Sequence, residues 1–137
     1  MSNVTASHAA YRRGAVLAAT PGELVVMLYD GARRFLRQAV SAMEAGEVER
    51  AHVTLRYAER IVNHLDATLD YEQGEIAQRL HAIYVFCLSQ LGAARINQDT
   101  ARIEQVSGLL GELREAFSQA AAEVDRSAQI TAGVEHG

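Results

Sequence analysis

The sequence predicts an all-α protein: an antiparallel four-helix bundle with a short N-terminal arm packing on it. The chain has 137 residues, and 49% of them are hydrophobic, so a single domain can build a core. It contains one proline and no tryptophan, and the good helix formers Ala, Leu, Glu, Arg and Gln dominate. The alternation of β-branched residues that is typical of strands appears nowhere at useful length. These observations together favour helices alone.

The first helix begins with a clear signal at Thr20. The Thr20 hydroxyl can cap a helix, and Glu23 stands three residues later, where it can reach back in a capping box. Pro21 suits the first helical position because it has no N–H to satisfy there. The helix is expected to end at residue 44 or 45, before Gly46. Its predicted buried stripe is Leu24, Leu28, Gly31, Phe35, Ala39 and Met43.

Three more helices are predicted, over about 47–69, 75–95 and 100–124. Turn residues separate them at 70–74 and 97–99, where Asp99 can act as an N-cap. Short connections between helices of this length are typical of an antiparallel up-down bundle. The predicted stripes of the three helices are Ala51, Leu55, Ala58, Val62, Leu65 and Leu69; then Ile76, Leu80, Ile83, Tyr84, Cys87 and Leu91; then Ile103, Val106, Leu110, Leu113, Phe117 and Val124.

The chain therefore divides into an arm (1–19), a bundle (20–124) and a flexible C-terminal tail (125–137). The tail is small and polar, which is typical of frayed ends. The arm carries apolar side chains that a free segment would not need, so we expect it to dock on the bundle. Its apolar residues include Tyr11, Val16 and Leu17.

Charge and cysteine content narrow the classes of function. The net charge is −4, so the chain lacks the basic footprint of a nucleic-acid-binding protein. The N-terminal residues contain no apolar core of a signal peptide, and no apolar run approaches the ~20 residues of a membrane span. Cys87 is the only cysteine, which fits a reducing compartment. We expect a cytoplasmic protein without nucleic acid or membrane insertion.

No pattern of residues points to catalysis, a metal or a cofactor. A carboxylate-bridged metal site in a bundle needs Glu three residues before His, but Ile61 precedes His64 and Gln78 precedes His81 at that spacing. Cys87 lies on an apolar stripe, where a thiol behaves as a small hydrophobic residue. The sequence favours a protein that is not an enzyme.

Apolar residues are more numerous than one core needs. Residues 82–88 are apolar around the whole helix, so Val85 and Phe86 project outside its stripe, as Val26 and Met27 do on the first helix. Crowding in a small bundle is one explanation; a hydrophobic groove filled by a partner helix, and covered by the arm when empty, is the other. The candidate partner-binding residues are Tyr11, Val16, Leu17, Val26, Met27, Val85 and Phe86.

Segments along the chain resemble the FliS family of flagellin export chaperones. The most specific are Thr20-Pro21-Gly22-Glu23-Leu24 and Met27-Leu28-Tyr29-Asp30-Gly31, preceded by Tyr11 and Val16; the resemblance extends over roughly 11–124. Ala18 and Phe117 depart from it, because the family often has Thr and Trp there.

The resemblance implies a four-helix chaperone that binds the C-terminal segment of flagellin. Covering that segment would prevent premature polymerisation in the cytosol, and the loaded complex would dock on the membrane export gate. It also implies that the N-terminal arm moves aside from an apolar site. The alternative is a helical regulatory or homodimerising module with no flagellin role. In a homodimer, the spare apolar surfaces of two copies would pair when no partner is bound. Light scattering on the isolated protein distinguishes the two interpretations.

Overall fold

The computed structural model describes residue 10, residues 13 and 14, and residues 19–136, with side chains up to residue 130. Tyr11, Val16 and Leu17 lie outside the described residues, so their predicted role stays a prediction. Between residues 19 and 136 the chain forms four long helices and one short 3-10 helix, and no strand. These are α2 (Pro21–Glu44), α3 (Val48–Ala67), η1 (Tyr71–Gln73), α4 (Glu75–Asn97) and α5 (Thr100–His136).

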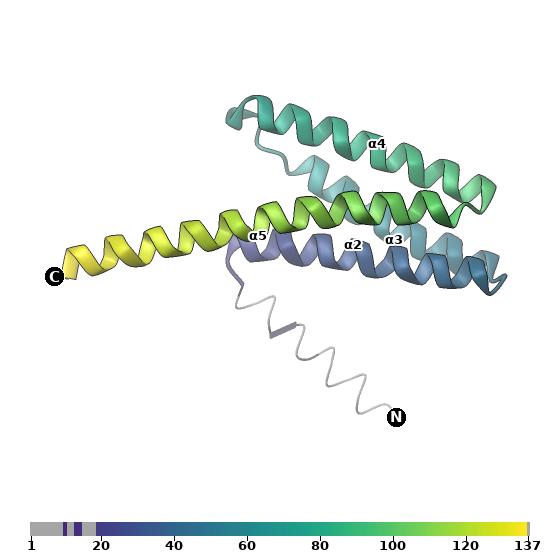
Figure 1. Ribbon diagram of the computed structural model, residues 1–137, viewed down its shortest axis with the longest axis horizontal. Helices are drawn as coiled ribbons and strands as arrows, with labels where there is room; N and C mark the ends of the chain where they lie inside the picture. The colour runs from purple at the N-terminus through teal and green to yellow at the C-terminus, as the bar shows by residue number, and fades with distance from the viewer. Residues whose placement is uncertain (1–9, 11–12, 15–18, 137) are drawn as a thin grey trace.

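The helices form the antiparallel bundle that the sequence predicts. Helix α2 packs closely against both α3 and α5, whereas α4 packs less extensively against α3 and α5. Figure 1 shows that α4 lies near α5 at its C-terminal end and diverges from it toward its N-terminal end. The antiparallel direction of α2 and α5 is visible in their contacts, since Asp30 meets Arg114 while Gly22 meets Ala121.

Local signals explain most of the helix ends. The Glu23 N–H donates to the Thr20 hydroxyl at 3.2 Å, and Pro21 is the first residue of α2, as predicted. Gly46 and Gly74 have positive φ angles of 72° and 77°, which glycine adopts without a steric penalty. Asp99 precedes α5 and accepts a hydrogen bond from the Arg102 N–H at 3.2 Å. The predicted starts of the four helices are therefore confirmed to within one residue, whereas α3 ends two residues before and α4 two residues after its predicted end.

Helix α5 is longer than the sequence prediction. It was expected to end near Val124, but it continues to His136. Residues 120–130 contain Ala, Glu, Arg and Gln and neither Gly nor Pro, so nothing local stops the helix. Gly22, the second residue of α2, lies against Ala121, so the part of α5 that follows Ala121 extends past the bundle (Figure 1). The flexibility of residues 125–137 stays a prediction. So does the division of the chain into an arm, a bundle and a tail.

The core confirms the predicted stripe of α3 and much of those of α4 and α5, although Val124 of α5 is 66% exposed because it lies past the end of the bundle. In α2 it confirms Gly31 and Ala39 and shifts the rest of the stripe. On α2 the fully buried residues are Tyr29, Ala32, Leu36, Ala39 and Ala42, whereas Leu28 and Phe35 are only partly buried. Part of the stripe was placed about one residue out of phase, because the Phe35 ring lies against Tyr57 of α3 rather than in the centre of the bundle. The buried residues of the other helices include Leu55, Ala58, Val62, Tyr84, Cys87, Leu91, Ile103, Val106 and Leu110.

Candidate partner-binding groove

An apolar groove of about 420 Å³ opens where α4 diverges from α5. Helices α4 and α5 form its walls, α3 and α2 contribute to it, and Thr68, Asp70 and Gln73 are its polar members. Its apolar lining is Val25, Leu65, Leu69, Ile76, Ala77, Leu80, Tyr84, Leu113, Ala116, Phe117 and Ala120. A groove of this composition can bury the apolar side of a peptide or helix.

The segment before α4 gives the groove its open end. The Asp70 carboxylate accepts hydrogen bonds from the Glu72 N–H at 3.0 Å and from the Gln73 side chain at 3.3 Å, which stabilises the 3-10 turn η1. Gly74 then redirects the chain into α4 with its positive φ angle. Ile76, predicted as a core residue, is consequently 59% exposed and lines the groove together with Leu80.

Polar contacts attach α4 to α3 near both of its ends. The His81 Nδ1 atom lies 2.6 Å from an Asp66 carboxylate oxygen, and Arg95 forms an ion pair with Glu59. Burial, with a smaller contribution from nearby Arg56, lowers the pKa of the Arg95 guanidinium. The side-chain hydrogen bond from Arg102 of α5 to Gln90 of α4, at 3.1 Å, lies in the C-terminal half of α4, away from the groove.

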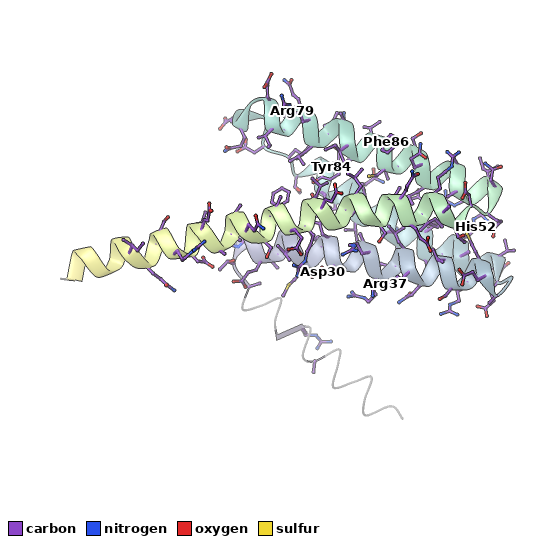
Figure 2. All side chains as sticks on the ribbon, in the orientation of Figure 1. Asp30, Arg37, His52, Arg79, Tyr84 and Phe86 are labelled. Carbon is purple, nitrogen blue, oxygen red and sulfur yellow. The ribbon has the colours of Figure 1, made fainter. Side chains whose placement is uncertain are left out.

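Two tyrosines meet beneath the groove. The hydroxyls of Tyr29 on α2 and Tyr84 on α4 share a hydrogen bond, and Figure 2 shows Tyr84 between α4 and α5. Burial, the largest cause, raises the pKa of both phenols, so both are neutral at physiological pH. The Tyr29 ring stacks on Phe117 with centroids 5.6 Å apart. Tyr84 and Phe117 therefore connect the groove to the buried core.

An ion pair fixes the α5 wall against α2. The Arg114 guanidinium donates to both carboxylate oxygens of Asp30, at 3.0 and 3.4 Å. Asp30 follows Tyr29 in α2, and Arg114 stands three residues before Phe117 in α5. The ion pair therefore holds the register of the two helices at the groove. Hydrogen bonding to Asp30 raises the pKa of Arg114, which stays charged.

Of the candidate residues from the sequence, the four that the structure describes do not line the groove. Val85 and Phe86 are 49% and 52% exposed on the side of α4 away from the core, which excludes the explanation that they crowd the core. Val26 and Met27 are partly buried, and their neighbour Val25 is the α2 residue that lines the groove. Sequence reasoning assigned the groove residues of α4 and α5 to the core, because periodicity identifies an apolar face but not what covers it.

The single cysteine of the chain is buried and offers no reactive thiol. Cys87 is buried, and burial raises its pKa to about 11, so the thiol is protonated near neutral pH and is a poor nucleophile. Within the described ranges, His, Cys, Asp and Glu side chains form no group that could hold a metal ion. None of the helices described is long and apolar enough to cross a bilayer.

Comparison with known proteins agrees with this architecture. The family model "Flagellar protein FliS" matches residues 2–124. The chain is 35% identical over 113 residues to the flagellar secretion chaperone FliS of Bacillus subtilis (strain 168), covering 82% of this chain and 84% of the relative. It is 39% identical over 107 residues to FliS of Salmonella typhimurium (strain LT2), covering 77% and 79%.

A solved structure shares the fold. A bacterial flagellar chaperone superposes with a TM-score of 0.71 at 15% sequence identity, over 85% of this chain and 98% of that one. The family model spans nearly the whole bundle, and the curated relatives carry one function in their names. The chain therefore belongs to the FliS family of flagellar secretion chaperones.

Proposed function

We propose that this protein is a cytoplasmic export chaperone that binds the C-terminal segment of flagellin and keeps it from polymerising before secretion. The observation that carries the proposal is the apolar groove between α4 and α5, which is open along the side of Ile76 and Leu80. An amphipathic segment of a client can bury its apolar side chains there, and a client that is disordered when free would fold as it binds. The loaded complex then docks on the membrane export gate.

The role requires binding only. A groove lined by aliphatic and aromatic side chains stabilises a client by removing apolar surface from water, at about 25 cal/mol per Å². Its polar members, Thr68, Asp70 and Gln73, are not arranged as a nucleophile and a base. The protonated thiol of Cys87 and the neutral phenols of Tyr29 and Tyr84 lie in the core, where they pack. We therefore propose a chaperone that is not an enzyme.

Mixing the protein with flagellin monomer tests this function. We expect a 1:1 complex and suppressed filament growth from seeds at equimolar chaperone. Deleting the C-terminal segment of flagellin should abolish the complex. Unaltered polymerisation by intact flagellin at equimolar chaperone would contradict the proposal.

The N-terminal arm is proposed to cover apolar surface of the bundle until flagellin arrives. The described chain enters α2 at Pro21, and Val25 of the groove stands one turn later, so the arm is attached beside the groove. Deleting residues 1–19 should raise the binding of a hydrophobic dye or cause self-association, without unfolding the four helices. Hydrogen exchange in the arm that does not change on adding flagellin would argue against displacement.

The exposed face of α4 that carries Val85 and Phe86 is proposed as a second part of the surface that contacts flagellin. Phe86 is half-exposed, so Phe86→Ala should weaken flagellin binding by ~1–3 kcal/mol, as truncation of an interface anchor does. Its effect on the free energy of unfolding should stay below the ~3–5 kcal/mol of a buried Phe. Calorimetry and urea unfolding on the same variant measure both quantities. A large loss of stability with unchanged affinity of the folded fraction would remove Phe86 from the contact.

A further inference from the structure

A second surface combines aromatic rings with positive charge on the seam between α2 and α3. The Phe35 and Tyr57 rings lie with centroids 5.1 Å apart, and the Arg60 guanidinium sits 5.7 Å from the Tyr57 ring centroid. Beside them, Ile61 of α3 packs near the backbone of Gly31 in α2, and the Arg34 guanidinium lies next to the same glycine. We call these residues the α2/α3 patch: Arg34, Phe35, Tyr57, Arg60 and Ile61.

The two arginines of the α2/α3 patch have no acidic partner in the described part of the chain. Neither guanidinium takes part in an ion pair there. The acidic side chains of α3 nearest in sequence are already engaged: Glu59 with Arg95 and Asp66 with His81. The patch is therefore locally positive although the protein carries a net charge of −4.

The α2/α3 patch is separate from the groove. None of its five residues lines the groove. Helix α3 reaches α4 through Glu59 and Asp66, and α2 reaches α5 through Asp30, whereas Phe35 and Tyr57 of the patch meet where α2 and α3 contact each other. A ligand seated in the groove would leave Tyr57, which is 43% exposed, accessible.

We propose that the α2/α3 patch is a second docking surface, which binds an acidic segment of a partner protein that carries an apolar anchor. Carboxylates of the segment would form charge-assisted hydrogen bonds with Arg34 and Arg60, whose planar guanidinium groups suit two-point contact. An aliphatic or aromatic side chain of the segment would pack on Phe35, Tyr57 and Ile61. Complementary charge is what selects this class of partner, because the patch offers cations without counterions.

A nucleic acid fits these residues less well. Two arginines neutralise too few phosphates for appreciable binding at physiological salt. Ile61 offers an apolar contact that a phosphate backbone does not use. The inference does not rest on the proposed binding of flagellin, because it concerns a different surface and a different ligand chemistry.

The test uses the full-length protein and a fluorescein-labelled helical peptide of about four turns, with Glu on one face and Leu and Phe on the other. A matched peptide has Gln in place of every Glu, and a single-stranded oligonucleotide of similar length represents a simple polyanion. Arg34→Glu/Arg60→Glu is compared with Arg79→Glu/Arg126→Glu, which changes the net charge equally at exposed sites elsewhere. Melting temperatures establish that each variant is folded, and Arg34→Gln/Arg60→Gln replaces the first pair if charge reversal unfolds it.

Fluorescence anisotropy should show that the acidic peptide binds the parent protein and that the patch variant binds it roughly tenfold or more weakly. The control pair should retain affinity within about twofold, and the affinity of the Gln peptide, which the apolar groove can also bind, should not differ between the parent and the patch variant. Equal weakening of the Gln peptide by the patch variant, equal binding of the oligonucleotide, equal weakening by the control pair or no binding of the acidic peptide would each overturn the inference. Flagellin binding by the patch variant is measured in parallel and should be unchanged, so the two proposals fail separately.

Discussion

Ile76→Glu is expected to weaken binding of the flagellin C-terminal segment by roughly 100-fold or more. A client in the groove would desolvate the new carboxylate without forming a hydrogen bond or ion pair with it. The free protein should tolerate the change. Ile76 is 59% exposed, and as the second residue of α4 it lies where a negative charge interacts favourably with the helix dipole. Calorimetric titration gives the affinity, and thermal unfolding gives the stability.

The matched control for this variant is Ile96→Glu. Ile96 is 82% exposed near the other end of α4 and does not line the groove. It should leave the affinity within a few-fold of the parent value, which separates an effect of position from an effect of charge. Unchanged affinity of folded Ile76→Glu would show that the client does not use the groove.

Tyr84→Phe should lower the free energy of unfolding by ~1–3 kcal/mol, because it leaves the buried Tyr29 hydroxyl without its hydrogen-bond partner. The double variant Tyr29→Phe/Tyr84→Phe removes both polar groups and should recover part of this loss. Urea unfolding of the two single variants and the double variant measures the coupling between the hydroxyls. Additive effects of the single changes would contradict an energetic link between the two hydroxyls.

The same tyrosines predict a loss of stability in alkali. Burial raises the pKa of Tyr29 and of Tyr84 in the folded protein, whereas both phenols ionise near pH 10 when the chain is unfolded. Their stabilising contribution is therefore complete below about pH 10 and is lost as the pH rises above that value. The double Phe variant should lose less stability than the parent protein over this range in pH-dependent urea unfolding.

The fold was predictable from the sequence because its signals are local. Thr20 and Pro21 start α2, Gly46 and Gly74 mark turns, and Asp99 precedes α5, each through a hydrogen bond or backbone angle that involves only a few residues. The end of α5 was missed because residues 120–130 contain neither Gly nor Pro, so nothing there stops the helix. The phase of α2 was missed because Phe35 packs against Tyr57 at a seam, and periodicity does not distinguish a seam from the centre of the bundle.

The candidate site was predictable only in part. The sequence showed an excess of apolar residues on α4 and placed Val85 and Phe86 outside its buried stripe. Both side chains are exposed in the structure. The groove itself depends on the divergence of α4 from α5, which follows from long-range contacts such as Asp66 with His81 and from the turn at η1. Such contacts leave no periodic signal, so Ile76 and Leu80 could not be told from core residues.

The most direct test of the central claim places a tryptophan in the groove. The chain has no tryptophan, and Phe117 lines the groove while stacking on Tyr29, so Phe117→Trp reports on this site alone. Titration with a tryptophan-free peptide of the flagellin C-terminal segment should shift the emission to shorter wavelength and saturate at one peptide per chaperone, since the bound peptide excludes water from the ring. Binding of the peptide by calorimetry without any change in this emission would place the client elsewhere on the protein and contradict the account.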